Sequence, residues 1–145
     1  MIPPFDERGN LPPGIHNATW RELEERLGGT PWRRFLLLKL REALTQLQRA
    51  HCRTVYIDGS FVTANDAPDD FDACWESDGV DVAALDPALL DFSEGRRAQK
   101  ERYWGELLPA DMVAEPAGIS VLDFFQRDRA SQPKGIIEIN LEAGL

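Results

Sequence analysis

The chain has 145 residues, of which 43% are hydrophobic and 28% are charged, and its net charge is −9. This composition is typical of one globular domain and argues against intrinsic disorder. No apolar run reaches membrane-spanning length, and the first residues lack the features of a signal peptide, so we expect a cytoplasmic protein. Two cysteines are too few for a disulfide framework or a zinc site, so we expect Cys52 and Cys74 to be free thiols.

Residues 1–18 are expected to be an irregular lead-in, because four prolines and two glycines fall within them. A single domain would then occupy residues 19–145. Thr19 opens a capping box for a first helix, which Gly28 ends. Thr30 then caps, and Pro31 starts, a longer helix that runs to about Gln48.

The second of these helices carries a wide apolar stripe that is typical of a core-facing side. Its members are Trp32, Phe35, Leu36, Leu40, Ala43, Leu44 and Leu47. Arg33, Arg34 and Arg41 fall between them, and we expect all three to be exposed. The functional alternative for these arginines is a docking patch for an acidic partner.

The most informative segment begins with residues 54–58, whose β-formers predict a buried strand. Gly59 and Ser60 follow it, and a polar loop leads to a second apolar stretch that carries Asp70 and Asp72. Residues two apart on a strand point to the same side, so we expect these two carboxylates to lie close together. Such a pair is tolerable if it shares a proton or a cation, and Mg²⁺ prefers hard oxygen ligands of this kind.

Gly59 would let the backbone approach a phosphate, and amides at the start of a following helix would attract the anion. The structural alternative is that the Gly-Ser pair only makes a turn and the two acids lie in a solvated loop.

Further elements are expected along the rest of the chain. A helical turn is predicted at residues 86–90, a helix from Ser93 to Trp104, and a short strand-like segment at residues 105–109. Residues 120–126 have the form of a capping box that opens a helix. Residues 135–141 alternate well and predict a last strand.

Charge is unevenly distributed, since residues 56–95 hold eleven acidic and no basic side chains. This block is either a solvated acidic surface or a site that binds phosphates only through a divalent metal. A nucleic-acid groove needs positive charge, so nucleic acid is disfavoured as a partner and a protein or small-molecule acceptor is preferred.

The order of strand, Gly59-Ser60 turn, loop and Asp70-Phe71-Asp72 resembles the signature of the nucleotidyltransferase superfamily, which has the polymerase-beta-like fold. Residues 57–63 and 134–137 also resemble a branch of this superfamily that consists of small bacterial proteins. That branch is similar to the minimal nucleotidyltransferases of toxin–antitoxin systems. The resemblance implies an α+β fold in one domain, with helices packed on a small mixed β-sheet and two helices near the N-terminus.

The same resemblance implies roles for individual residues. Gly59 and Ser60 would bind a nucleoside triphosphate, and Asp70 and Asp72 would hold Mg²⁺ at the catalytic centre. Active members commonly have a third acid on a later strand, for which Glu106 is the first candidate.

Asp123 and then Asp111 are the alternatives for this third acid. Asp58 departs from the family pattern, because an apolar or aromatic residue usually precedes the glycine.

Three functions stay open on the sequence. The leading one is metal-dependent transfer of a nucleoside monophosphate to a protein or small acceptor, in a toxin–antitoxin or phage-defence pair whose partner a neighbouring gene encodes. The second is a catalytically inactive module of the same fold that acts as a nucleotide sensor or antitoxin-like partner. The third is a structural or protein-interaction domain whose acidic block is only surface.

Overall fold

The computed structural model describes all 145 residues and has an α+β architecture built on one mixed sheet. The sheet has the strand order β1-β7-β2-β3-β4, with β1 at Gly14–Ala18, β2 at Thr54–Asp58, β3 at Phe71–Trp75, β4 at Gly105–Pro109 and β7 at Gly135–Asn140. β1 runs parallel to β7, and β3 runs parallel to β4, whereas β2 is antiparallel to both of its neighbours. The expected mixed sheet is therefore confirmed.

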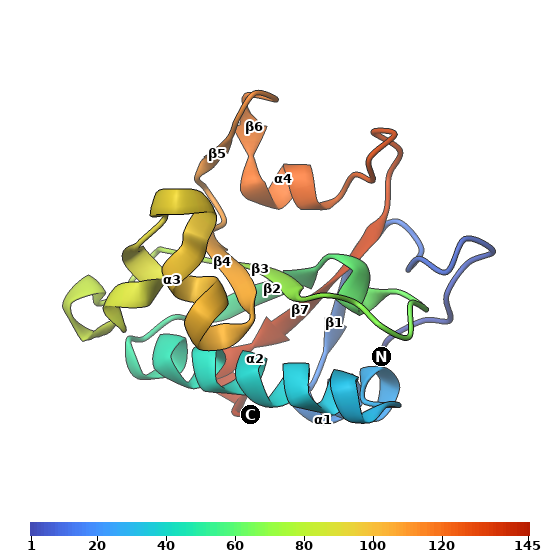
Figure 1. The fold of residues 1–145 in the computed structure, drawn as a ribbon, viewed down its shortest axis with the longest axis horizontal. Helices are drawn as coiled ribbons and strands as arrows, with labels where there is room; N and C mark the ends of the chain where they lie inside the picture. The colour runs from blue at the N-terminus through green and yellow to red at the C-terminus, as the bar shows by residue number, and fades with distance from the viewer.

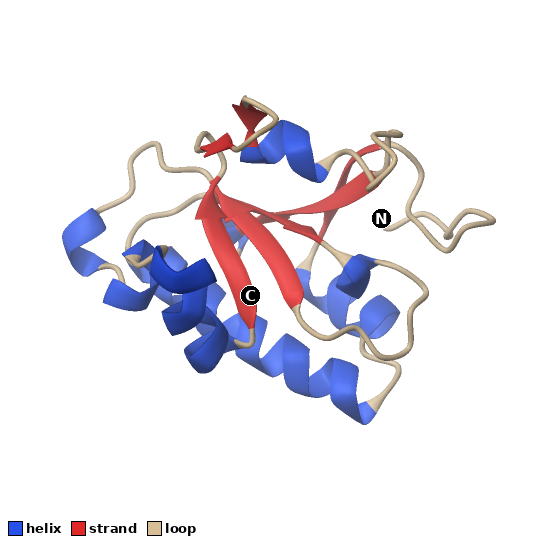
Figure 2. Cartoon of the chain, turned by 45° about the horizontal axis from the view of Figure 1, so that its top comes forward, coloured by secondary structure: helices blue, strands red, loops and turns tan.

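The helices lie on two sides of this sheet. α1 (Trp20–Leu27) and α2 (Pro31–Arg49) lie below it in Figure 1, and the short α4 (Val121–Phe125) lies above it. α3 (Ser93–Tyr103) packs beside β4, and a small two-stranded sheet, β5 (Val113–Ala114) with β6 (Ile119–Ser120), stands next to α4. Figure 2 shows the sheet between these helical groups. No helix combines the length and apolar character that crossing a bilayer requires.

The two helices predicted near the N-terminus are present, and the sequence explains both. The Thr19 side chain accepts a hydrogen bond from the Glu22 amide, and the Thr30 side chain accepts one from the Arg33 amide. Each threonine therefore satisfies one of the unpaired amides of a helix N-terminus. Trp20, Leu23 and Leu27 of α1 are all buried.

Strand alternation divides the sheet into two unlike faces. The face toward α1 and α2 carries the large core, to which the strands contribute Val55, Ile57, Phe71, Ala73, Trp75, Leu107, Ile137 and Ile139. The opposite face carries a smaller core around α4, which includes Tyr56, Cys74, Phe125 and Ile136. This second core covers only part of its face, and acidic residues occupy the neighbouring positions.

The lead-in differs from the expectation. Residues 1–13 form no helix or strand, but Gly14–Ala18, expected to be irregular, form the edge strand β1 along β7. Its side chains are exposed or half-buried. The strand is therefore held in the sheet mainly by its backbone pairing with β7. The boundary proposed between residues 18 and 19 therefore falls directly after a strand of the main sheet.

Arg33 was expected to be exposed, and the structure shows that this is wrong, since its side chain is only 5% exposed. Its guanidinium donates hydrogen bonds to the carbonyl oxygens of Leu27, Phe61, Thr63 and Asn65. Residues 61–65 directly follow the Gly59-Ser60 turn, so Arg33 fixes the course of the loop that leaves this turn. The planar guanidinium suits this role because its five donors point in fixed directions.

Candidate functional site

Three acidic residues form one row across the sheet. Asp58 on β2 is paired in register with Asp72 on β3, and Asp72 is paired with Glu106 on β4. Register partners in neighbouring strands project to the same face, so all three side chains lie on the α4 face of the sheet. Asp70 comes immediately before β3 and joins them.

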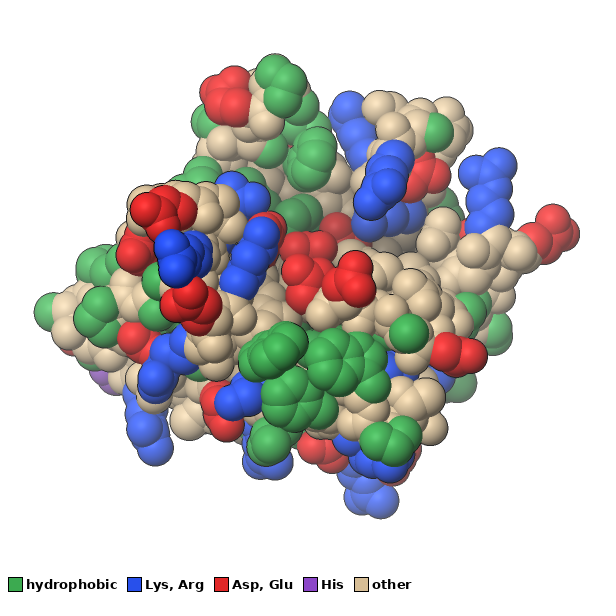
Figure 3. Space-filling view, viewed as in Figure 1, with side chains coloured by type: hydrophobic (Ala, Val, Ile, Leu, Met, Phe, Trp, Pro, Cys, Tyr) green, Lys and Arg blue, Asp and Glu red, His purple; other side chains and the backbone are tan.

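These four acids line one cavity of about 640 Å³. Gly59, Ser60 and Thr63 line another part of its wall, and α4 contributes Phe124 and Phe125. Tertiary structure thus brings together all five residues that the sequence singled out, Gly59, Ser60, Asp70, Asp72 and Glu106. Figure 3 shows an acidic cluster near the centre of the molecular surface in this view, with basic side chains on both sides of it.

Gly59 has a backbone conformation that its neighbours require. Its φ is +84°, in the region that favours glycine, and a Cβ at this position would lie 2.6 Å from Oδ2 of Asp72. The glycine therefore lets the turn pass directly beside the Asp72 carboxylate. Ser60 is exposed and opens a single 3-10 turn, Ser60–Val62. The helix expected to follow the Gly-Ser pair is only this one turn, which is too short to contribute a helix dipole.

The Asp72 carboxylate is strongly perturbed. Burial, and after it the negative charges of Asp70, Glu106 and Asp58, together raise its pKa to about 7 against the opposing effect of Lys134. The pKa of Asp70 is also raised, first by burial and then by Glu106. Repulsion within this cluster is what a proton or a cation would relieve.

Asp58 is buried with 4% of its surface exposed. Lys134 forms an ion pair with it, the Nζ atom lying 2.7 Å from Oδ1. Burial nevertheless raises the pKa of Asp58, although Lys134 and the Gly59 amide act against this. Lys134 precedes β7, so the pair links this strand to the end of β2.

Glu106 has two cationic partners from α3. Its Oε1 lies 3.1 Å from the Nη2 of Arg96 and 3.0 Å from the Nζ of Lys100. Arg96 reaches this position from a first turn that is not α-helical, because Glu94, Gly95 and Arg96 all have positive φ. The helix expected from Ser93 is therefore regular only after Arg96.

The other two candidates for a third acid lie elsewhere. Asp123 is exposed in the first turn of α4, where its backbone amide donates to the Ser120 hydroxyl, and it does not line the cavity. Asp111 accepts a hydrogen bond from the Ser77 hydroxyl and is also outside the cavity. Only Glu106 of the three is brought to Asp70 and Asp72.

Basic residues at this site were missed by the sequence reasoning. These are Arg127, Arg129 and Lys134, which line the cavity from the segment between α4 and β7. All of them lie outside the block 56–95 that holds no basic side chain, so local charge counting could not find them. The Lys134-Gly135 segment, quoted only for its likeness, was the available signal.

The acidic side chains of the cavity are the candidate metal ligands. No group of three or more His, Cys, Asp or Glu side chains is gathered tightly enough to enclose a metal ion by itself. Mg²⁺, however, commonly uses one or two protein carboxylates together with substrate phosphates. Asp70 and Asp72, with the raised pKa of both carboxyl groups, fit a cation that is shared with a bound phosphate.

The fold and the site define an α+β protein with an acidic cavity on one face of a mixed sheet. The chain belongs to a family of unknown function, DUF6932, whose model matches residues 3–140. No curated protein and no solved structure matches it.

Proposed function

We propose that this protein is a metal-dependent nucleotidyltransferase-like protein that transfers a nucleoside monophosphate from a nucleoside triphosphate to a protein or small acceptor. The observation that carries the proposal is the row Asp58, Asp72 and Glu106, completed by Asp70 and facing the Gly59-Ser60 turn in one cavity. The resemblance of the Gly59-Ser60 and Asp70-Phe71-Asp72 segments to the nucleotidyltransferase superfamily supports the same reading.

Each wall of the cavity has a separate role in this proposal. Asp70 and Asp72 hold Mg²⁺, which when bound supplies charge stabilisation at the reacting phosphate. Gly59 leaves room for a phosphate beside Asp72, and the Ser60 hydroxyl donates to it. Arg127, Arg129 and Lys134 stabilise the negative charge of the β- and γ-phosphates from the other side.

In the transfer step, an acceptor oxygen attacks the α-phosphorus and forms a new P–O bond. The bond from the α-phosphorus to the bridging oxygen of the β-phosphate breaks, and pyrophosphate leaves. The acceptor hydroxyl loses its proton to the Glu106 carboxylate. The acceptor is a protein, such as one encoded by a neighbouring gene, or a small molecule.

The test is incubation of the purified protein with α-labelled ATP, Mg²⁺ and the product of the neighbouring gene. Transfer of label to the partner or to the protein itself is expected, with release of pyrophosphate, and Asp72→Asn should abolish it. Asp123→Asn is the matched control, because Asp123 is an exposed acid outside the cavity. Equal transfer by wild type and Asp72→Asn would remove Asp72 from the mechanism.

One observation favours a second function, a nucleotide-binding module without catalysis. Glu106 is already paired with both Arg96 and Lys100, whose cationic groups occupy its Oε1 and leave that oxygen less free to contact an acceptor hydroxyl. A protein of this kind would act as a nucleotide sensor or an antitoxin-like partner. Calorimetry with ATP and Mg²⁺ distinguishes the two, since binding without any transfer of label supports the module.

A further inference from the structure

An aromatic cluster lies at the end of the sheet where β3 and β4 begin. Trp32 and Phe35 of α2 are stacked with ring centroids 5.5 Å apart. Trp104, between α3 and β4, meets both edge-on at centroid distances of 5.9 and 5.5 Å. Figure 3 shows a hydrophobic patch on the same face of the molecule as the acidic cluster and directly next to it.

Two short connections, one along the chain and one through a hydrogen bond, hold this cluster beside the acidic cavity. Trp104 is two residues before Glu106, and two residues span at most about 7 Å. On the other side, the Trp32 Nε1 donates to the carbonyl oxygen of Pro68 at 2.5 Å, two residues before Asp70. The cluster therefore contacts the chain just before β3 and just before β4, two of the three strands that carry acids of the cavity.

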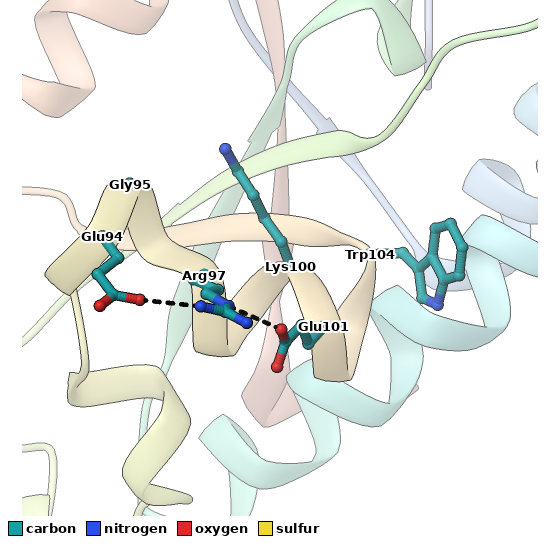
Figure 4. A pocket seen from close by; sticks show the side chains of 6 residues that line it. All are labelled: Glu94, Gly95, Arg97, Lys100, Glu101 and Trp104. Atoms are coloured by element: carbon teal, nitrogen blue, oxygen red, sulfur yellow. Dashed lines mark hydrogen bonds and ion pairs between the residues drawn. The ribbon is translucent and has the colours of Figure 1, made fainter.

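A shallow groove of about 570 Å³ continues from Trp104 along α3. Lys100 lines this groove, and its Nζ lies 3.0 Å from Oε1 of Glu106, which lines the acidic cavity. In Figure 4, Lys100 points away from the surface pairs of Arg97 with Glu94 and Glu101, and Trp104 stands at the other end of the groove. The groove and the cavity are therefore adjacent, and the ion pair of Lys100 with Glu106 joins their linings.

Trp104 also occupies a backbone position that does not suit it. Its φ and ψ are 61° and 32°, in the left-handed region where a helix ends and where glycine or asparagine is usual. The next residue is Gly105, where an added Cβ would lie 2.6 Å from the Phe71 ring. A glycine is therefore needed at residue 105 to leave room for that ring. Trp104 is 44% exposed, so burial of its ring offsets only part of the cost of this left-handed backbone conformation.

From these contacts we infer that Trp104 is the nucleobase-binding residue of the site, stacking the base of a nucleoside triphosphate whose phosphates lie in the acidic cavity. The inference rests on the proposed function. The exposed part of the indole offers a π surface, which any nucleobase can stack on. The alternative role of Trp104, to join α3 to α2 through the aromatic cluster, does not require an exposed ring.

The test compares two probes, ATP and inorganic tripolyphosphate, by isothermal titration calorimetry in the presence of Mg²⁺. Tripolyphosphate has the phosphates but no base. Trp104→Gly removes the ring and suits the left-handed backbone, so it should fold. It is expected to weaken ATP binding about tenfold and to leave tripolyphosphate binding unchanged. Trp104→Phe should restore most of the ATP affinity.

Leu38→Ala is the matched control, because Leu38 is an exposed apolar residue on α2, 56% exposed, and should leave both affinities unchanged. Unchanged ATP affinity in Trp104→Gly, or an equal loss for both probes, would overturn the base-stacking role while the phosphate site stands. If wild type binds neither probe, the proposed function fails, and this inference fails with it.

Discussion

Asp72 on β3 lies directly opposite Glu106 on β4, although the two residues are thirty-four positions apart in the chain. Parallel strands cannot be joined by a tight turn, so a crossover that includes α3 separates them. The same crossover carries Arg96 and Lys100, which pair with Glu106. One connection thus delivers both an acid of the cavity and the cations that neutralise it.

The pKa of Asp72 predicts how stability depends on pH. Its folded value, about 7, lies above the ordinary value near 4, so the folded state holds a proton that the unfolded state has lost between these two values. The free energy of unfolding should therefore fall as pH rises from about 4 to 7, by about 2–4 kcal/mol from this group.

Asp72→Asn should remove that fall, so the variant gains stability over wild type at pH 8 and not at pH 4. Urea unfolding at a series of pH values measures it, with Asp123→Asn as the control that keeps the wild-type profile. A parallel profile for Asp72→Asn and wild type would contradict the assignment.

Mg²⁺ should stabilise the wild-type protein at pH 8. A ligand that binds only the folded state at one hundred times its dissociation constant adds about 2.7 kcal/mol, which raises the melting temperature by several degrees. Asp70→Asn and Asp72→Asn should each abolish this rise, and chelation of the metal should reverse it in wild type. Thermal unfolding with and without Mg²⁺ is the measurement, and an equal rise in wild type and both variants would count against a site at these carboxylates.

Gly59→Ala tests the close approach of the turn to Asp72. The new Cβ would meet the Asp72 carboxylate at 2.6 Å in a backbone with φ of +84°, so we expect a loss of stability of about 2–4 kcal/mol. Gly79→Ala is a matched control, since Gly79 has a φ of +77° and nothing within 4 Å of the added atom.

The control should lose only about 1 kcal/mol, from backbone strain alone. Denaturant unfolding of the two variants gives the difference that belongs to crowding against Asp72. Equal losses in both would mean that the carboxylate moves aside freely.

Arg33→Met should destabilise the protein by about 2–4 kcal/mol, because it leaves the buried carbonyl oxygens of residues such as Phe61 and Thr63 without a donor. Arg34→Met, at the next position of α2, removes an exposed arginine with one bond to the Gly28 carbonyl and should change stability by less than about 0.5 kcal/mol. Arg33→Lys should not restore stability, because an ammonium cannot reproduce the planar set of donors. Urea unfolding compares the three variants, and similar stability in all of them would show that Arg33 does not hold the loop.

Local patterns in the sequence determined much of this molecule. Capping threonines and apolar periodicity defined α1 and α2. Residues 54–58 were recognised as a strand by their β-forming residue types, and residues 135–141 by the alternation of apolar and polar residues. The Gly59-Ser60 turn and the paired acids were also visible, because backbone freedom and residue spacing are properties of neighbouring residues. Strand β1 was missed because an edge strand gains its stability from pairing with a distant strand, which leaves little trace in its own side chains.

The tertiary structure alone decided which charges meet. The acidic block 56–95 contains no basic residue, yet folding places Lys134 against Asp58 and Lys100 against Glu106. Arg33 is buried for the same reason, since the carbonyl groups that it satisfies belong to a loop about thirty residues away. The residue types and their spacing thus came from the sequence, whereas the neutralisation of the acids and the assembly of one cavity depend on contacts between segments that only the folded sheet brings together.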